Sequence, residues 1–502
     1  MNPRLRAMCE LLMPEVREYA GLHEYDGRVQ DLSPSGVTAA LARLGQGPTE
    51  PDPHDEAHLR TAEEGVRTAL GLVEEHRRNP LVHIANLDLA GYDREYAPEP
   101  ERQAARRRHL ASWPAAVDGA IQSLDQVPAP VARALLGATR GLAAGVEAGE
   151  EPEIESARKA HARLVHQLED IGERGSPDVA IGAPGLARLM GDAEGIPVDL
   201  GRLAVRANAE RDRVHGLLSD ACAQLRPDTR PAELVAELVA DHPGPEGIDA
   251  EARELITEAT AFVVERDLLG DPGGECRVGP APPSRRWAMA MMSWSAPFEA
   301  DAPAWYYVNP PDPSWPADEQ AEWLAVFSRT TLPAITVHEV TPGHYAHGRM
   351  LRRLDSDVRR TLFSSAFVEG WAHYAEELCA EEGFRSEDPR FAIGVHVEAL
   401  VRITRLAVAI GIHTGAMTMA DAVHRFEHDG FLRGPAARSE AERSSFDPTY
   451  GRYTWGKLEI RALRDEARAR WGGRYRHRRF HEAMLGLGAP PLGLIGDALG
   501  PS

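Results

Sequence analysis

Residues 336–350, which read TVHEVTPGHYAHGRM, constrain the fold of this chain most strongly. They contain His338 and Glu339, a pair that in many metallohydrolases supplies one metal ligand and the general base beside it. A second histidine, His344, follows six positions after the first. Histidines four positions apart share one face of a helix, whereas a separation of six turns the second imidazole about 120° away. A regular helix could not bring both histidines to one metal ion.

The residues between the two histidines can break the helix. Pro342 lacks the N–H that would bond to the carbonyl of His338 and clashes with that carbonyl, while Gly343 accepts almost any backbone angle. We therefore predict an H-E-x-x-H motif with a two-residue bulge, which brings His344 back toward the metal. If His344 is not a ligand, His347 is the next candidate.

A third ligand is expected from residues 367–378, FVEGWAHYAEEL. The pattern predicts a helix in which Glu369, His373 and Glu376 fall at i, i+4 and i+7 and so lie on one face. Two acids and a histidine among apolar residues are typical of an inward-facing site. The two segments together predict one Zn²⁺ ion per chain, held by two histidines and one carboxylate. From the residues alone, each of the three side chains could complete the site.

The motifs HEVTPGH and VEGWAHYAEEL together resemble a bacterial family called domain of unknown function 885, whose members are regarded as gluzincin-like metallopeptidases. The resemblance covers roughly the C-terminal half of the chain. It implies a mostly α fold related to carboxypeptidase Taq: a large helical gluzincin-like bundle with a deep central cleft and a small β-hairpin or short sheet beside the metal helix. It also favours Glu369 as the third ligand, with His373 and Glu376 as groups that orient a ligand.

The resemblance continues through the apolar residues 397–412 and into His413. The family has an arginine and a histidine in a similar segment, and these match Arg402 and His413. The match implies that His413 stabilises the oxyanion formed during hydrolysis and that Arg402 contacts the substrate. The alternative for His413 is a buried histidine that caps the helix. Arg402 and Arg405 lie within an apolar run, so both need partners.

A later stretch, DPTYGRYTWGKLEI, resembles the family's Y-x-x-G-K segment and matches Tyr453 and Lys457 to it. The resemblance implies that Tyr453 hydrogen-bonds the tetrahedral intermediate and that Lys457 binds a substrate carboxylate. Tyr450 is a rival for the phenol role and a further candidate for substrate binding. Where the family usually has proline-glycine-glutamine, residues 449–452 read TYGR, which weakens any inference about the substrate.

The composition limits the partners of the chain. Among 502 residues, 77 acidic side chains against 56 basic ones give a net charge of −21, which argues against nucleic acid or an anionic membrane as the main partner. The four cysteines are scattered, so disulfides and zinc knuckles are not expected. The first residues do not resemble a signal peptide, and no run approaches ~20 apolar residues. We therefore predict a cytoplasmic protein without a membrane partner, for which a homodimer is one option.

Two regions of the chain differ in composition and in the role that we expect for them. Residues 1–270 are rich in helix-forming residues, and we expect them to form one side of the cleft. Residues 271–502 form the metal-binding catalytic region, in one continuous fold with the first. Methionine and aromatic residues in short runs predict a β-hairpin between residues 288 and 311. In the first region helices are predicted at 37–44, 55–76, 104–110, 131–146, 153–172, 200–225 and 250–269.

The function predicted from these residues is zinc-dependent hydrolysis of a peptide or small amide substrate, with a carboxypeptidase or a dipeptidase as candidate types. His338, His344 and Glu369 hold the zinc ion, and Glu339 is the general base toward water. One alternative is a metal-dependent biosynthetic enzyme that acts on a non-peptide small molecule. A less favoured alternative is a non-catalytic helical scaffold with a structural metal, which has no need of Glu339.

Overall fold

The structure is a computed structural model that describes residues 1–146, 151–282 and 289–500. The predicted mostly α fold with a small sheet is confirmed, because 67% of the structure is helical and three short strands form one sheet. Within the described residues, no helix combines the length and the apolar character needed to cross a membrane.

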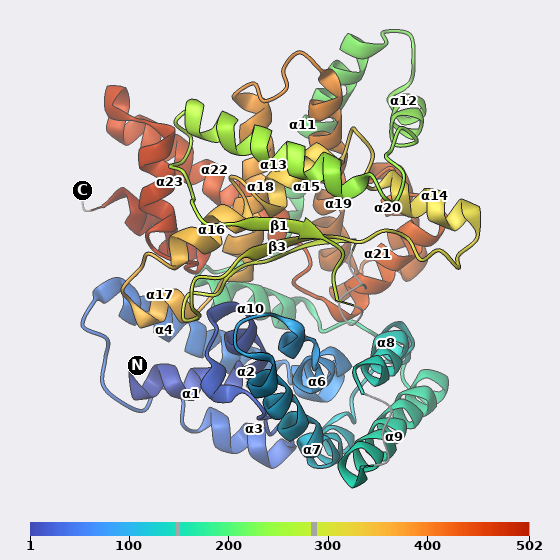
Figure 1. Cartoon of the computed structure of the whole chain (residues 1–502), viewed down its shortest axis with the longest axis vertical. Coiled ribbons are helices and arrows are strands. Elements are labelled where there is room, and N and C mark those ends of the chain that lie inside the picture. The colour runs from blue at the N-terminus through green and yellow to red at the C-terminus, as the bar shows by residue number, and fades with distance from the viewer. Residues whose placement is uncertain (147–150, 283–288, 501–502) are drawn as a thin grey trace.

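The chain begins in the lower part of the molecule as drawn in Figure 1, which extends to α9. Amphipathic helices bury their apolar faces there in two hydrophobic clusters. These helices are α1 (Pro3–Leu11), α2 (Met13–Glu15), α3 (Pro34–Leu41), α4 (Pro53–Val66), α5 (Glu75–Arg78), α6 (Pro80–Leu87), α7 (Glu99–Ser123), α8 (Ala129–Gly141) and α9 (Pro152–Arg174).

The following helices form the junction and the upper part (Figure 1). Those before the metal motif are α10 (Ala183–Glu194), α11 (Leu200–Leu225), α12 (Pro231–Leu238), α13 (Ile248–Glu265) and α14 (Ala317–Ala325). Those that contain or follow the motif are α15 (Leu332–Glu339), α16 (His344–Leu351), α17 (Asp357–Thr361), α18 (Ser365–Glu381), α19 (Pro389–His413), α20 (Met419–Asp429), α21 (Gly434–Phe446), α22 (Arg452–Trp471) and α23 (His477–Leu485).

The small sheet crosses the middle of the molecule (Figure 1) and packs against α13 and α15. Its central strand, β3 (Ala304–Val308), pairs in parallel with β1 (Cys276–Gly279) and antiparallel with β2 (Ala290–Ser293). β2 and β3 therefore form the predicted hairpin, although residue 288 lies outside the described residues. β1 was not predicted, because its four residues are surrounded by glycine and proline.

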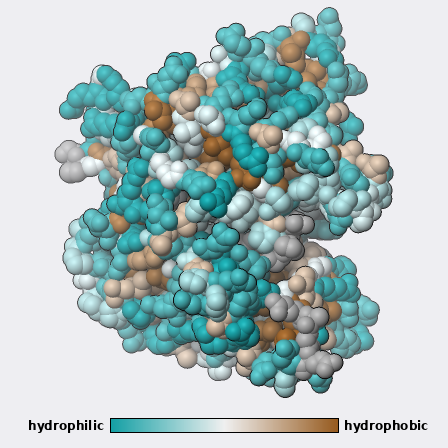
Figure 2. All heavy atoms as spheres, viewed as in Figure 1, coloured by the Kyte–Doolittle hydropathy of each residue, from teal (hydrophilic) through white to brown (hydrophobic). Residues whose placement is uncertain are grey.

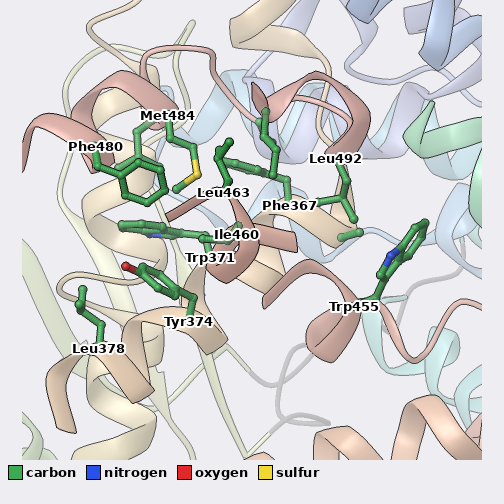
Figure 3. Close-up of a cluster of buried hydrophobic side chains, with 14 of the residues drawn as sticks. Phe367, Trp371, Tyr374, Leu378, Trp455, Ile460, Leu463, Phe480, Met484 and Leu492 are labelled. Atoms are coloured by element: carbon green, nitrogen blue, oxygen red, sulfur yellow. The ribbon is translucent and has the colours of Figure 1, made fainter. Parts of the chain in front are cut away.

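A cluster of large buried side chains fixes the position of α18 (Figure 3). Phe367, Trp371 and Tyr374 of α18 enter this cluster together with apolar side chains of α22 and α23. Leu203 and Leu268 belong to the same cluster although they precede residue 270. The two regions distinguished in the sequence therefore share a hydrophobic core.

Two glycines let α18 and α22 touch backbone to backbone. A Cβ added to Gly456 would lie 1.9 Å from the carbonyl oxygen of Ala366, and one added to Gly370 would lie 2.5 Å from Cα of Gly456. Neither position has room for a side chain. Glu369 and Tyr453 lie within one turn of these glycines, so the contact brings the two side chains toward one site.

Hydrophilic residues cover most of the face seen in Figure 2, in keeping with the charged composition. The surface is hollowed at the right of this view, between the lower part that carries α8 and α9 and the upper part that carries α14.

Candidate metal centre

The helix that carries His338 ends and restarts inside the predicted break. α15 ends at Glu339, and α16 begins at His344. The amide N–H of Gly343 donates to the carbonyl of Val337 at 3.1 Å, so the chain folds back against the end of α15. A Cβ on Gly343 would lie 1.7 Å from the carbonyl oxygen of His338, so this close approach requires glycine.

Trp371 anchors the break from α18. Its Nε1–H donates to the carbonyl of Pro342 at 2.9 Å, and the side chain is fully buried. The helix that supplies Glu369 therefore also fixes the segment that positions His344. We did not predict this role, because nothing in the sequence shows which carbonyl an indole N–H will meet.

The bulge brings the three predicted ligands together. The rings of His338 and His344 lie 4.8 Å apart, and their Nε2 atoms lie 3.6 Å and 3.4 Å from Oε2 of Glu369. Ligand atoms bound about 2.1 Å from one tetrahedral zinc ion lie about 3.4 Å from each other. The donor types and their spacing therefore fit zinc. The side chain of Glu369 is 23% exposed, which leaves the centre within reach of solvent.

Glu376 orients His338. Its Oε1 accepts a hydrogen bond of 2.6 Å from Nδ1–H of His338. An ionised carboxylate can only accept, so Glu376 holds a proton on Nδ1 and leaves Nε2 as the nitrogen that binds a metal ion once its own proton is released. Burial would raise the pKa of Glu376, but Arg402 and His338 outweigh burial and lower that pKa.

The imidazoles and the Glu369 carboxylate attract one another. Burial would lower the pKa of His338, but its interactions with Glu369 and Glu376 outweigh burial and raise the pKa to about 9. Burial would raise the pKa of Glu369, but His338 and His344 hold it well below its usual range. Glu369 is therefore ionised at neutral pH and suited to bind a cation.

Glu339 lies beside the ligands. One carboxylate oxygen of Glu339 and one nitrogen each of His338 and His344 lie within 4.8 Å of one another. Glu339 could thus compete with Glu369 for the role of ligand. Oε2 of Glu369 forms close contacts with both Nε2 atoms, so we assign Glu369 as the ligand. Glu339 is half-buried at the last position of α15, where it can act on a water molecule.

Tyr453 approaches the same centre from the first turn of α22. Its ring centroid lies 6.5 Å from that of His338. Burial and the charge of Glu369 raise the pKa of the phenol, and they outweigh Arg452 and Arg405, which lower it. The phenol is therefore protonated at neutral pH and can donate a hydrogen bond.

His373 lies on the predicted face but contacts Glu376 instead of a ligand nitrogen. It is buried, and its Nδ1 lies 3.6 Å from Oε1 of Glu376, beyond hydrogen-bond length. Burial, assisted by the charge of Lys457, lowers the pKa of His373 to about 3, so the ring is neutral.

His413 lies away from the centre, which corrects its predicted role at the oxyanion. It is the last residue of α19, eleven residues and so about 16 Å along the helix from Arg402. Its Nε2–H donates to the carbonyl of Ser444 at 2.7 Å, and burial lowers its pKa. Its position matches the alternative from the sequence, a buried histidine at a helix end.

The position of Lys457 also does not allow its predicted role in substrate binding. The side chain is fully buried, and Nζ lies 2.7 Å from Glu377 and 2.9 Å from Glu210. The ammonium group shares these two buried carboxylates with Arg213 and Arg461, so it is held inside the protein instead of facing a substrate.

Tyr450 does not reach the substrate side of the site either. It is fully buried, its hydroxyl donates to Glu440, and the guanidinium groups of Arg443 and Arg405 lie 4.3 Å and 4.7 Å from its ring centroid. Tyr450 therefore supports the neighbouring arginines instead of contacting a ligand.

The two arginines within the apolar run of α19 are both paired. Nη1 of Arg402 lies 3.1 Å from Glu398 and 3.3 Å from Glu376, while Arg405 makes two hydrogen bonds of 2.8 Å to Glu440. Arg402 thus supports the carboxylate that orients His338, which replaces its predicted contact with substrate.

A pocket of about 300 Å³ lies beside the sheet, and none of its lining residues belongs to the metal centre. Trp294 lines it, and the Trp294 ring lies 6.4 Å from the ring of His344. Trp305 and Tyr307 of β3 also line the pocket, and their rings stack 5.8 Å apart. Aromatic walls of this kind suit an apolar or aromatic group.

Comparisons with known proteins extend to nearly the whole chain. Residues 14–499 match a family described as "Bacterial protein of unknown function (DUF885)". The fold is similar to a solved structure of a "putative lipoprotein of unknown function" from Shewanella oneidensis, with TM-score 0.78, 19% identity and 98% of each chain covered. A second "putative lipoprotein", from Colwellia psychrerythraea, gives TM-score 0.74 and 17% identity over 99% of each chain. No curated protein matches the sequence at a significant level.

The two similar structures correct the predicted cytoplasmic location. Both proteins are described by the words "putative lipoprotein", which point away from the cytoplasm. The prediction rested on the scattered cysteines, the first residues and the lack of a long apolar run, and these features do not identify the compartment in which a folded domain works. We therefore withdraw the cytoplasmic assignment.

The resemblance seen in the sequence rested on the C-terminal half, whereas the family match also includes most of the helices that precede the metal motif. The chain is a member of the DUF885 family of bacterial proteins of unknown function.

Proposed function

We propose that this protein is a zinc-dependent hydrolase of peptide or related amide bonds, of the gluzincin class. The observation that carries the proposal is the position of one carboxylate oxygen of Glu369, 3.6 Å and 3.4 Å from Nε2 of His338 and His344. Glu339 beside these ligands supports a catalytic centre. A structural zinc site usually fills all four positions with protein ligands and needs no base.

Each residue of the centre has a distinct task. His338, His344 and Glu369 would hold the ion, which supplies Lewis acidity and lowers the pKa of a bound water. Glu339 accepts a proton from the water that attacks the carbonyl carbon, and returns this proton to the leaving amine. Tyr453 donates a hydrogen bond to the carbonyl oxygen as negative charge develops on it.

The surroundings of the centre suit an extended substrate with an apolar group. β2 is an edge strand of the sheet, and an extended peptide can add to such an edge through main-chain hydrogen bonds. The pocket lined by Trp294, Trp305 and Tyr307 offers room for one apolar side chain or acyl group beside the sheet.

The substitution Glu339→Gln tests the proposal. The amide keeps the shape and polarity of the side chain but cannot act as a base, so zinc content should stay normal while turnover falls by about 10²-fold or more. Zinc is measured by elemental analysis, and single-turnover rates are measured on a panel of peptides, acylated amino acids and other amides. Glu427→Gln, at an exposed position of α20, is the matched control and should leave both quantities unchanged.

An unchanged rate in Glu339→Gln would remove the base from the mechanism. If the zinc-loaded parent cleaves no amide of the panel but converts a non-peptide small molecule, the alternative of a biosynthetic enzyme replaces the peptidase.

A further inference from the structure

Three arginines surround the phenol of Tyr453. The guanidinium carbons of Arg405, Arg452 and Arg402 lie 5.2 Å, 5.6 Å and 6.0 Å from the Tyr453 ring centroid. Each has a carboxylate partner: Arg405 binds Glu440, Arg452 binds Asp447, and Arg402 contacts Glu398 and Glu376. The guanidinium groups of these three arginines are therefore already paired with carboxylates of the protein.

Arg443 is a neighbouring arginine with only one long contact to a carboxylate. Its closest carboxylate is Asp447, and Nη2 of Arg443 lies 3.5 Å from Oδ2, at the outer limit of a hydrogen bond. Arg452 already binds both oxygens of Asp447, at 2.7 Å and 2.9 Å. No further hydrogen bond of Arg443 is found within the described residues, and its side chain is 37% exposed.

The ring of Tyr450 holds the Arg443 guanidinium in place without using its donors. The guanidinium carbon lies 4.3 Å from the ring centroid, within cation–π contact of the ring. This contact takes up none of the N–H donors as a hydrogen bond to a carboxylate would. Glu440 in turn fixes Tyr450, because it accepts a hydrogen bond from the hydroxyl.

We infer that Arg443 binds a free carboxylate of the substrate, so that the enzyme acts on peptides or N-acylated amino acids that end in this group. The inference rests on the proposed hydrolase function, because it treats Tyr453 and the metal ligands as the reacting centre. A partly exposed guanidinium with a single long hydrogen bond retains donors for the two oxygens of a carboxylate. Lys457, the residue predicted from the sequence for this task, is buried against Glu377 and Glu210.

The test begins with binding to the protein before zinc is added. Calorimetry measures the affinity for N-benzoylphenylalanine and for its C-terminal amide. The parent should prefer the acid by about tenfold or more, the scale of one charge-assisted bidentate pair. Arg443→Met should abolish this preference, and Arg443→Lys should keep part of it, because a point charge replaces the fork. Arg438→Met, at an exposed position of the same helix α21, should behave like the parent.

Turnover by the zinc-loaded protein separates this inference from the proposed function. Benzoylglycylphenylalanine and its C-terminal amide are compared, and Arg443→Met should raise KM for the acid while leaving the amide unaffected. Equal affinity of the parent for acid and amide, or no binding of either, overturns the carboxylate site. If the acid binds selectively but no amide bond is cleaved, the hydrolase proposal fails while the carboxylate site stands.

Discussion

At the scale of single residues, substitutions of the two glutamates on one face of α18 should differ in how far they lower the affinity for zinc. Glu369 supplies a candidate ligand atom, so Glu369→Gln should abolish tight binding. Glu376 acts through Nδ1 of His338, so Glu376→Gln should weaken binding by roughly 10- to 100-fold. Titration of zinc against a competing chelator measures both variants. The reverse order would show that Glu376 is the ligand.

The same titration applies to the histidines. His344→Ala should lose bound zinc, because its Nε2 is one of three candidate ligand atoms. His347 is the weaker candidate: its Nε2–H donates to the carbonyl of Gly488 at 3.0 Å, and among the described residues it has no ion-pair contact with Glu369 such as His338 and His344 make. A full complement of zinc in His344→Ala would show that His344 is not a ligand and would make His347 the candidate in its place.

The candidate ligands could be predicted from the sequence because they depend on short-range geometry. The spacing of His338 and His344, with Pro342 and Gly343 between them, determines the break within a few residues. Glu369 followed from helical periodicity in a neighbouring segment.

The roles of the remaining residues depend on partners that are distant in the chain. Lys457 pairs with Glu210, almost 250 positions earlier in the sequence, and no local pattern indicates that contact. The sequence also cannot indicate that the carbonyl of Ser444 accepts the hydrogen bond from His413, because every residue has a carbonyl. The sequence did not indicate a substrate-binding role for Arg443, since an arginine on a polar helix is usually solvated.

At the scale of elements, the start of α18 depends on a buried acid. Ser364 caps the helix: its hydroxyl accepts from the amide of Phe367 at 2.9 Å and donates to Glu194 of α10 at 2.7 Å. The amide of Leu492 also donates to Glu194, at 2.8 Å. Burial outweighs these hydrogen bonds and raises the pKa of Glu194 from 4.5 to about 7.

This raised pKa makes stability depend on pH. Between pH 4.5 and about 7 the folded chain retains a proton on Glu194 that the unfolded chain has released. The contribution of Glu194 to the free energy of unfolding therefore falls by about 3 kcal/mol in total as the pH rises through this window. Glu194→Gln has no proton to lose, so the difference in unfolding free energy between variant and parent should grow in favour of the variant from pH 5 to pH 8. Denaturant titrations at each pH measure the unfolding free energy of both proteins. If the difference between them stays the same from pH 5 to pH 8, the raised pKa of Glu194 is refuted.

Long helices with regular periodicity could be predicted, and interrupted ones could not. The helix predicted at 200–225 coincides with α11 (Leu200–Leu225). The prediction of 104–110 was too short, because α7 runs from Glu99 to Ser123 with Pro114 inside it. Trp113 and Val117 on either side of the proline are fully buried, so core packing outweighs the local cost of a helical proline.

At the scale of the whole molecule, one buried lysine ties together segments from both regions of the chain. Lys457 of α22 lies between Glu377 of α18 and Glu210 of α11. Lys457→Met would leave the two carboxylates paired only with Arg213 and Arg461, and the loss of this buried charged contact should lower the free energy of unfolding by about 1.5–3 kcal/mol.

Denaturant unfolding measures this loss. Lys159→Met is the matched control, because Lys159 is the other lysine of the sequence and its side chain is 74% exposed on α9. A stable Lys457→Met protein with a higher KM for carboxylate substrates would restore the role predicted from the sequence.

The contact between Gly370 and Gly456 has a consequence for how such a protein can change. Main-chain atoms alone set the distance between the two helices that carry Glu369 and Tyr453, so no rotamer of any side chain can widen or narrow it. For the proposed hydrolase, selection for new substrates would therefore act on residues around the site, such as the arginines of α21, while the two helices keep their separation. The proposed site would then consist of a fixed pair of helices and a variable surround that recognises the substrate.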